Sequence, residues 1–380
     1  MSYTVIARRY RPQTFDEMVG QEHITTTLKN AITEQKVSHA YLFAGSRGVG
    51  KTSLARILAK GLNCRTGPTV TPCNKCEICR GISDGTDPDV IEMDAASNRG
   101  IDEIRSLREN VGYVPLRARY KVYIIDEAHQ LTRDSFNALL KTLEEPPAHV
   151  KFIMATTELN KLPDTIISRC QRFNFHRLTN QSIFKRLQQV CQQEKVEITP
   201  GILSSVAQMA YGSMRDAESM LDQLISYAGQ EISEKDLEIL AGTVQQAEIF
   251  TLVEAIYNGD FENIVKTCRD IFIQGKNIVL FIDQIIEHCR YLILTLIADK
   301  QSSLLDEEII QSRDQYLQQA KKFTPAILLD YIDRLVETRQ KLKDVSNPRI
   351  LLELALFKLI KSPGEANKES EKQSLSVPLQ

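Results

Sequence analysis

The glycine-rich run at residues 45–52, GSRGVGKT, limits the folds open to this chain. It matches the phosphate-binding pattern G-x-x-x-x-G-K-[ST], follows an apolar segment at 41–44 and opens a helical pattern at 50–62. In such a loop, backbone N–H groups surround a polyphosphate and the helix N-terminus adds a favourable dipole. A glycine-rich turn with an exposed lysine is the alternative. The residues expected to bind nucleotide are Gly45, Ser46, Arg47, Gly48, Val49, Gly50, Lys51, Thr52 and Ser53.

Particular side chains in and beyond this loop have distinct expected roles. Lys51 would contact the β- and γ-phosphates, and Thr52 would coordinate Mg²⁺. After the apolar segment 122–125, Asp126 would complete the Mg²⁺ shell and Glu127 would polarise the attacking water. An isolated acidic pair is usually a solvated turn, but an intact phosphate loop in the same chain reverses that expectation. The sequence therefore predicts Mg²⁺-dependent hydrolysis of a nucleoside triphosphate.

Short apolar runs alternate with longer helical patterns through the first half of the chain. This alternation predicts an α/β fold with a parallel sheet covered on both faces. The runs indicate strands at 41–44, 90–95, 121–127, 151–157 and 172–176, and the longer patterns indicate helices at 50–62, 101–111 and 132–143.

Helical periodicity replaces the strand pattern after about residue 178. A turn is expected at 199–201, and the last helix is expected at 350–360. The predicted organisation is an ATPase domain at 1–178, a small helical lid at 179–242, a helical oligomerisation domain at 243–361 and a disordered tail at 362–380.

The net charge of −2, from 47 basic and 49 acidic residues, gives no global positive field for nucleic acid. Any DNA contact must therefore come from local patches. The segment 99–121 carries six basic and three acidic residues, and Arg99 and Lys141 are the candidate DNA contacts. A solvated charged face is the alternative interpretation.

The expected cellular compartment is inferred from the N-terminus, the most apolar segment and the cysteine content. No signal peptide is recognisable, although the basic N-terminus faintly resembles a transit peptide. The apolar stretch 277–298 contains Asp283, Glu287, His288 and Arg290, which favours a buried helix over a membrane span. Eight cysteines without a signal peptide indicate a reducing compartment. We therefore expect a soluble, cytoplasmic protein.

Four of the cysteines, Cys64, Cys73, Cys76 and Cys79, follow the pattern C-x8-C-x2-C-x2-C. Four thiolates suit a closed tetrahedral Zn²⁺ site, and closed sites are structural because no position is left for substrate. Disulfides or free thiols are the alternatives. The remaining cysteines lack partners at ligand spacing and are expected to be core or incidental thiols: Cys170, Cys191, Cys268 and Cys289.

Several motifs together resemble the AAA+ ATPases, and more closely the gamma and tau subunit family of bacterial DNA polymerase III clamp loaders. Besides the phosphate loop, the four-cysteine insertion and the acidic pair, they are the segments 7–16, 19–23, 94–97, 135–147, 168–170 and 212–216. The four-cysteine insertion is the most specific, and the match is dense to about residue 242.

The resemblance implies further roles for individual residues. Thr157 would occupy the first sensor position, near the γ-phosphate. Arg169 would be an arginine finger that reaches the ATP of a neighbouring subunit, and Arg215 would be the second sensor in the lid. The N-terminal arginines Arg8, Arg9 and Arg11 would lie near the adenine, which explains the basic N-terminus without a transit peptide. For each, a surface arginine in an ion pair is the alternative.

The resemblance implies an ATPase motor subunit that opens the sliding clamp and loads it onto primed DNA. Its cofactors would be ATP, Mg²⁺ and Zn²⁺. Its partners would be the delta and delta-prime subunits, the clamp, primed DNA and other copies of itself, with no membrane partner. The chain ends about twenty residues after Lys361, which resembles the family's short form or a second, truncated copy and puts tethering of helicase and polymerase in doubt.

Two other functions compete with this interpretation. An AAA+ helicase or branch-migration motor is one, because residues 126–129, DEAH, resemble a helicase acidic box. That family would bring neither the four-cysteine insertion nor the segment 168–170. A non-hydrolysing scaffold of the delta-prime type is the other, and the intact Lys51, Thr52, Asp126 and Glu127 argue against it.

Overall fold

The computed structural model describes residues 4–98, 101–242, 244–297, 313–342, 345 and 347–360. The chain divides into two compact units, Met1–Ser233 and Glu234–Gln380, which are described separately. The predicted finer division, with boundaries at 178, 242 and 361, stays a prediction. The candidate DNA contact Arg99 and the predicted tail at 362–380 lie outside the described residues.

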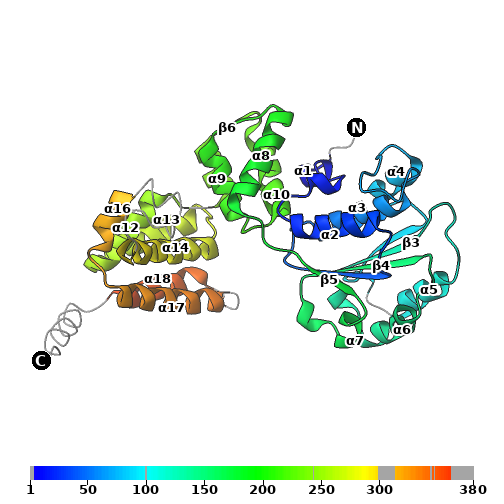
Figure 1. Cartoon of the computed structure of the whole chain (residues 1–380). Helices are drawn as coiled ribbons and strands as arrows, with labels where there is room; N and C mark the ends of the chain where they lie inside the picture. The colour runs from blue at the N-terminus through cyan, green and yellow to red at the C-terminus, as the bar shows by residue number, and fades with distance from the viewer. Residues whose placement is uncertain are drawn as a thin grey trace, which may run out of the picture. The chain divides into compact units, whose positions relative to one another are not determined.

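A parallel sheet of five strands forms the centre of the first unit (Figure 1). The strand order across the sheet is β2-β3-β4-β1-β5, and each neighbouring pair runs parallel. The predicted parallel sheet is thus confirmed, with every strand within two residues of its expected ends. The strands are β1 (Ala40–Ala44), β2 (Val90–Asp94), β3 (Lys121–Asp126), β4 (Val150–Thr156) and β5 (Gln171–Asn174).

Helices cover both faces of this sheet, which explains why β1 and β4 are buried along their whole length (Figure 1). Side chains alternate between the two faces, so that Tyr41 and Phe43 join one core cluster while Ala40 and Leu42 join the other. The helices of the first face are α2 (Glu22–Thr33) and α3 (Lys51–Asn63), and those of the second are α5 (Ile101–Val111), α6 (Arg133–Glu144) and α7 (Asp164–Ile167).

The carboxyl ends of the central strands meet at one edge of the sheet. Ala44 lies opposite Thr156 in the β1–β4 register, and Ile125 lies opposite Met154 in the β3–β4 register. The phosphate loop follows β1, and the acidic pair ends β3. Parallel pairing therefore brings these segments together, although they are far apart in the sequence.

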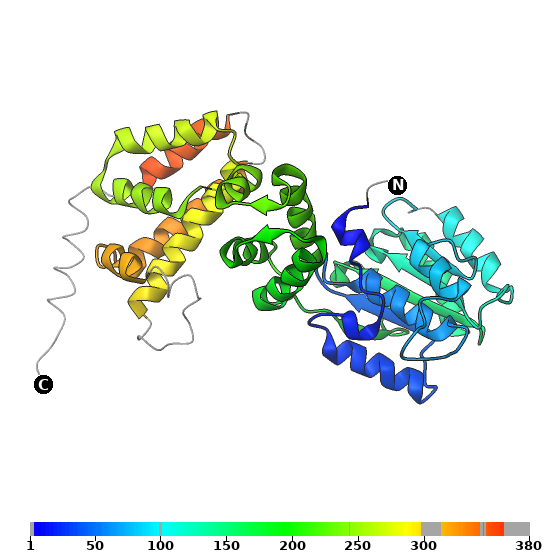
Figure 2. The same ribbon diagram turned by 90° about the horizontal axis from the view of Figure 1, so that it is seen from above.

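A helical layer follows the sheet within the first unit. It consists of α8 (Asn180–Glu194), α9 (Pro200–Met209) and α10 (Met214–Ala228), with a two-stranded parallel ladder of β6 (Glu197–Ile198) and β7 (Glu231–Ile232) (Figure 2). The sequence did not predict this ladder, because two-residue strands carry no periodic signal. The expected turn at 199–201 was wrong. Pro200 begins α9 instead, since proline has a suitable φ for the first helical position and no N–H to lose there.

Shorter helices complete the first unit. The N-terminal α1 (Ile6–Arg9) contacts the helical layer, where the backbone N–H of Ile6 donates a 3.1 Å hydrogen bond to Asp222 of α10. The remaining short elements are η1 (Phe15–Glu17), α4 (Glu77–Asp84), η2 (Ala128–Gln130) and η3 (Leu159–Lys161).

The second unit is helical in its described part. Its helices are α11 (Glu234–Ala241), α12 (Gln246–Asn258), α13 (Phe261–Ile273), α14 (Ile278–Ile297), α16 (Arg313–Ala320), α17 (Pro325–Lys341) and α18 (Pro348–Leu359). The apolar stretch expected to be a buried helix forms α14, which contributes Phe281, Ile285 and Leu292 to the core. Among the described residues, no helix is both long and apolar enough to cross a membrane.

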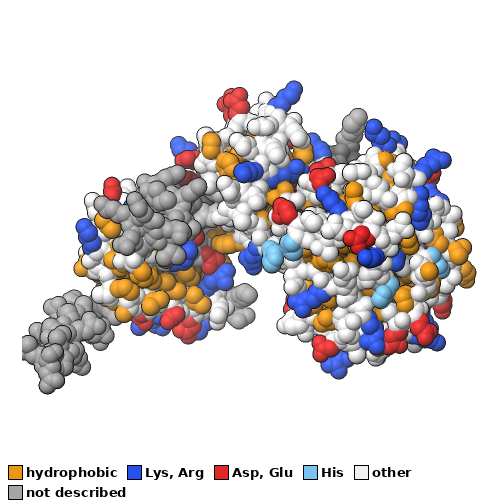
Figure 3. Space-filling model, viewed as in Figure 1, with side chains coloured by type: hydrophobic (Ala, Val, Ile, Leu, Met, Phe, Trp, Pro, Cys, Tyr) orange, Lys and Arg blue, Asp and Glu red, His pale blue; other side chains and the backbone are white. Residues whose placement is uncertain are grey.

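Apolar side chains also reach the surface of this unit. Figure 3 shows them gathered over α17 and α18. They include Leu329 and Val336 from α17 and Ile350 and Leu354 from α18, each at least 39% exposed.

Candidate nucleotide-binding site

The phosphate loop connects β1 to α3 through two glycines in the left-handed region. Gly48 has φ +76° and Gly50, which caps α3, has φ +101°. A Cβ atom on Gly48 would lie only 1.9 Å from the hydroxyl oxygen of Ser213. Glycine is therefore required at Gly48 both for its backbone conformation and for the close approach of the helical layer.

Lys51 is held over the loop that carries it. Its ammonium donates hydrogen bonds of 2.8 Å to the carbonyl oxygens of Gly45 and Ser46. Burial lowers the pKa of Lys51, while the nearby Glu127 and Asp126 act in the opposite direction. The loop carbonyls thus keep a desolvated cation in place, and phosphate oxygens can replace them as its partners.

Thr52 and Asp126 lie together, as the sequence predicted for a magnesium site. The hydroxyl of Thr52 donates a 2.7 Å hydrogen bond to Oδ2 of Asp126. The other carboxylate oxygen, Oδ1, accepts a 2.9 Å hydrogen bond from the backbone N–H of Glu127. A hydroxyl and a carboxylate side by side are oxygen ligands of the kind Mg²⁺ takes, so these residues fit the ion.

Glu127 is held by its neighbours in a sparsely populated backbone conformation, with φ +48° and ψ 45°. Oε2 of Glu127 accepts a 2.9 Å hydrogen bond from the hydroxyl of Thr157 and lies 3.5 Å from Nδ1 of His129. His129 is itself held by the hydroxyl of Thr156, 3.0 Å from Nδ1. The sequence indicated His129 only as part of a helicase-like box, and not as a neighbour of Glu127.

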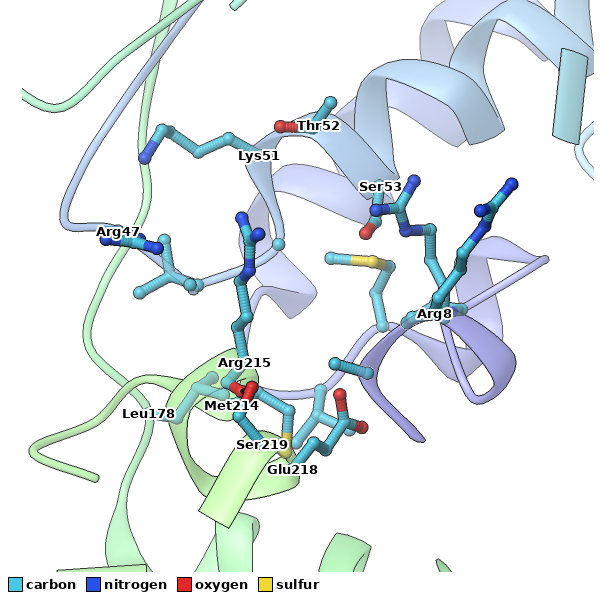
Figure 4. Close-up of a pocket in the computed structure, with 18 of the residues that line it drawn as sticks. Arg8, Arg47, Lys51, Thr52, Ser53, Leu178, Met214, Arg215, Glu218 and Ser219 are labelled. Carbon is cyan, nitrogen blue, oxygen red and sulfur yellow. Dashed lines mark hydrogen bonds between the residues drawn. The ribbon is translucent and has the colours of Figure 1, made fainter. Parts of the chain in front are cut away.

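The phosphate loop, Asp126 and Glu127 line part of one cavity of about 380 Å³. The helical layer closes it, since the backbone N–H groups of Met214 and Arg215 donate hydrogen bonds of 3.1 and 3.4 Å to the carbonyl oxygen of Gly48. Figure 4 shows Arg215 reaching from this layer toward the loop. Lining residues among those predicted for the site are Arg47, Gly48, Val49, Gly50, Lys51, Thr52, Ser53, Asp126, Glu127 and Arg215.

The N-terminal arginines lie in two different environments in the structure. Arg8 and Arg11 line the cavity, as expected if this segment lies near a base. Arg9 is not among the lining residues, and its guanidinium lies 3.1 Å from the carboxylate of Glu194.

Glu218 on α10 is a cavity residue that the sequence reasoning missed. It is only 5% exposed, and burial raises its pKa to about 7 although Arg186 and Arg11 act in the opposite direction. The available sequence signal was that Glu218 and Asp222 share a helix stripe with the apolar residues Ala217, Leu221 and Leu224.

Arg169 is not brought to this cavity. It follows α7, where its guanidinium lies 2.5 Å from Glu144 and donates a 2.7 Å hydrogen bond to the carbonyl oxygen of Thr165. Its side chain is 32% exposed, so the guanidinium is partly accessible to solvent.

The four predicted cysteine ligands do come together. The sulfur atoms of Cys64, Cys73, Cys76 and Cys79 all lie within 4.8 Å of one another. A tetrahedral zinc site with Zn–S bonds of about 2.3 Å needs sulfur separations of about 3.8 Å, so the cluster fits a metal with small adjustments. Burial raises the pKa of Cys79, and hydrogen bonds with Cys76 and Cys64 act in the same direction because they stabilise the protonated thiol.

The other four cysteines are as expected. Cys191, Cys268 and Cys289 are buried, and Cys170 is partly buried. Burial raises the pKa of the thiol in every one, to between about 11 and 12. They are inert core thiols rather than nucleophiles.

Several basic side chains of the segment 99–121 form contacts within the protein. Arg117 pairs with Glu77 and Asp87, Arg119 donates to the carbonyl oxygen of Cys64, and Lys121 is buried with its ammonium 3.0 Å from a backbone oxygen. Lys141 is exposed on α6. The segment is therefore a smaller basic surface than its composition suggests.

Three family models match consecutive parts of the chain. The DNA polymerase III delta subunit model matches residues 20–179, and the ATPase lid domain model of DNA polymerase III clamp loader subunits matches residues 182–230. The model of domain III of DNA polymerase III subunits gamma and tau matches residues 232–374.

Proteins that are similar to this chain over most of its length are named as gamma or tau subunits of DNA polymerase III. The chain is 38% identical over 365 residues to DNA polymerase III subunit gamma of Buchnera aphidicola (subsp. Acyrthosiphon pisum), covering 95% of this chain and 99% of that protein. It is 43% identical over 366 residues to subunit tau of Bacillus subtilis, covering 96% of this chain and 65% of that protein. It spans between 43% and 65% of the length of four tau or tau/gamma relatives.

Among solved structures, the RuvB Holliday junction branch migration motor of Thermotoga maritima is 18% identical, with a TM-score of 0.47. The similarity covers 65% of this chain and 79% of that one. A similarity of this size carries no argument for the competing helicase function.

Proposed function

The chain belongs to the gamma and tau subunit family of DNA polymerase III, and from this premise we propose that it is the ATP-hydrolysing motor subunit of a replicative clamp loader. ATP binding would set the assembled subunits into a form that opens the sliding clamp and holds primed DNA. Hydrolysis would then release the clamp closed around the template.

The nucleotide cavity is the observation that carries this proposal. The phosphate loop, the acidic pair after β3 and Arg215 of the helical layer all line it. A site that spans the sheet and the helical layer can couple the state of the nucleotide to the position of that layer. The match to a clamp loader ATPase lid model over residues 182–230 supports the same function.

The chemistry follows from the contacts in the cavity. Lys51 would exchange the carbonyl oxygens of Gly45 and Ser46 for those of the β- and γ-phosphates. Thr52 and Asp126 would hold Mg²⁺, which supplies positive charge against the transferring phosphoryl group. Glu127 would orient and polarise the attacking water.

Two arginines would complete the site. Arg215 would contact the phosphates from the helical layer, where its backbone already bonds Gly48. Arg169 would leave Glu144 and reach ATP bound by a neighbouring subunit, where a guanidinium stabilises charge on the transferring phosphoryl group. Because an exposed ion pair contributes little, separation of Arg169 from Glu144 costs about 1 kcal/mol or less.

The remaining parts would have structural and assembly roles. The four cysteines would hold Zn²⁺ in a closed site that stabilises the insertion between α3 and β2. Residues 243–361 would form the oligomerisation domain, for which the exposed apolar face of α17 and α18 is suited. The partners would be delta, delta-prime, the clamp, primed DNA and other copies of the chain, in the cytoplasm. Lys141 is the remaining candidate for DNA contact.

ATP turnover in the assembled state tests this function. The chain would be combined with candidate delta and delta-prime subunits and assayed with and without clamp and primed DNA. Strong stimulation that requires both clamp and a primer junction is the expected result. Stimulation by plain or branched duplex, indifferent to the clamp, would overturn the proposal in favour of a translocating helicase.

A further inference from the structure

The nucleotide cavity has two chemically different ends. Figure 4 shows Lys51 and Thr52 at one side of it, and Leu178, Met214 and Glu218 at the opposite side. The lining also includes apolar side chains of the N-terminal segment, namely Val5, Ala7, Pro12, Met18 and Val19. If phosphates occupy the Lys51 end, the apolar end is left for the flat faces of a base.

Glu218 is a carboxylate at this apolar end. The residue is only 5% exposed, and no hydrogen bond to its carboxylate forms within the described part of the chain. Its Oε1 lies 3.9 Å from Nε of Arg186, beyond hydrogen-bond distance. Arg186 also donates a 2.6 Å hydrogen bond to the carbonyl oxygen of Tyr10, which commits part of the guanidinium elsewhere.

A carboxyl group that is almost fully buried and receives no hydrogen bond from the described residues would gain one from a bound donor. The rise in its pKa to about 7 has the same physical origin. At neutral pH the group therefore takes both protonation states, and in either state a carboxyl oxygen can accept a hydrogen bond.

ATP offers few donors to such an acceptor. The base of ATP carries a single N–H donor group, the 6-amino group of adenine, and the ribose carries two hydroxyls. Ribose hydroxyls can be hydrated at the open edge of a cavity, whereas Glu218 is only 5% exposed, and its neighbours Arg186 and Arg11 can donate but cannot accept a hydrogen bond. The base is therefore the better match for a buried acceptor.

We infer that Glu218 accepts a hydrogen bond from the 6-amino group of adenine and is a specificity-determining residue of the site. This inference rests on the proposed ATP-dependent function. The lid helix α10 would then contact both ends of one nucleotide, with Arg215 at the phosphates and Glu218 at the base.

The test compares nucleoside diphosphates, which the site cannot hydrolyse. Calorimetry would measure binding of ADP, purine riboside diphosphate (which lacks the 6-amino group) and 2′-deoxyADP to the full-length chain with Mg²⁺. We expect the wild type to prefer ADP to purine riboside diphosphate by about tenfold, the range of a hydrogen bond to a partly charged group. In Glu218→Leu this preference should fall below about twofold.

Gln223→Ala is the matched control, because Gln223 lies on the same helix α10, is exposed and does not line the cavity. It should keep the wild-type preference. Glu218→Met, with a more adaptable side chain, replaces Glu218→Leu if the leucine variant fails to fold. A preference for the 6-amino group that persists without Glu218 would overturn the inference, as would a Glu218-dependent loss seen only with 2′-deoxyADP. Failure of the wild type to bind any of the three would instead overturn the proposed function.

Discussion

The hydroxyl of Thr157 donates a 2.9 Å hydrogen bond to Oε2 of Glu127, across the ends of the neighbouring strands β4 and β3. The contact ties the residue after one strand to the residue after the other. It leaves Glu127 with a fixed orientation in a partly buried left-handed turn.

Thr157→Val removes this hydrogen bond while keeping the side-chain shape. Hydrogen bonds to charged groups contribute about 1.5–3 kcal/mol, so turnover of ATP should fall about 10- to 100-fold. Nucleotide affinity should change little, because Thr157 does not line the cavity. Thr157→Ser, which retains the donor, should recover most of the activity. Full turnover by Thr157→Val would show that Glu127 needs no such support.

Lys51→Ala and Glu127→Gln should separate binding from hydrolysis. Lys51→Ala removes the cation that faces the phosphates, so ATP binding should be lost. Glu127→Gln should bind ATP normally but turn it over about 10²–10⁴ times more slowly, the usual contribution of a general base. Parallel binding and turnover assays distinguish the two. Full hydrolysis by either variant contradicts the assigned roles.

Arg169→Ala tests action on a neighbouring subunit. ATP binding by the isolated chain should be unchanged, while assembly-dependent turnover should fall by about 10³-fold or more, as for arginine fingers elsewhere. Arg172→Ala on strand β5 is the control, since Arg172 is an exposed arginine close in sequence. Loss of ATP binding by the isolated Arg169→Ala chain would count against the role.

Zinc removal should destabilise the first unit. Loss of about 3 kcal/mol corresponds to a melting temperature lower by about 6–12 °C for a unit of this size. Cys73→Ser should reproduce the effect of a chelator and lower the bound zinc, whereas Cys191→Ala, outside the cluster, should leave zinc content unchanged. Protein purified without chelator that contains no zinc would refute the site.

Glu218→Gln should make stability less dependent on pH. The folded-state pKa of about 7 lies above the usual 4.5, so the folded chain holds more protons than the unfolded chain between these values. The wild type should therefore lose stability as the pH rises through this window, by on the order of 2–3 kcal/mol.

The glutamine variant lacks this titration. The free energy of unfolding of Glu218→Gln should exceed that of the wild type by little near pH 5 and by most near pH 8. Calorimetric melts across that range would measure the difference. Equal differences at all pH values would show that Glu218 does not titrate in the folded chain.

The sequence predicted the sheet and the phosphate site well because both depend on local patterns. The apolar run before Asp126 and the spacing of Gly45, Gly50 and Lys51 are each complete within a few residues. The four cysteines were predictable for the same reason, since three of them lie within seven residues.

What the sequence did not reveal depends on contacts between distant segments. His129 reaches Glu127 only through the turn after β3, and the ladder of β6 and β7 joins residues more than thirty positions apart. Glu218 looked like an ordinary helix residue, because nothing local shows that the N-terminal segment covers it. The Arg117 and Arg119 contacts likewise reduce a basic run that composition alone favoured as a DNA surface.

The hydrogen bonds from the Met214 and Arg215 amides to the Gly48 carbonyl have an evolutionary consequence. They are made by main-chain atoms, which substitution of a side chain does not remove. The attachment of the lid to the phosphate loop is thereby independent of the side chains at positions 214 and 215, which are constrained instead by their place in the lining of the nucleotide cavity. Residue 48 is the exception, because a Cβ atom there would collide with Ser213 and disrupt the contact between the lid and the phosphate loop.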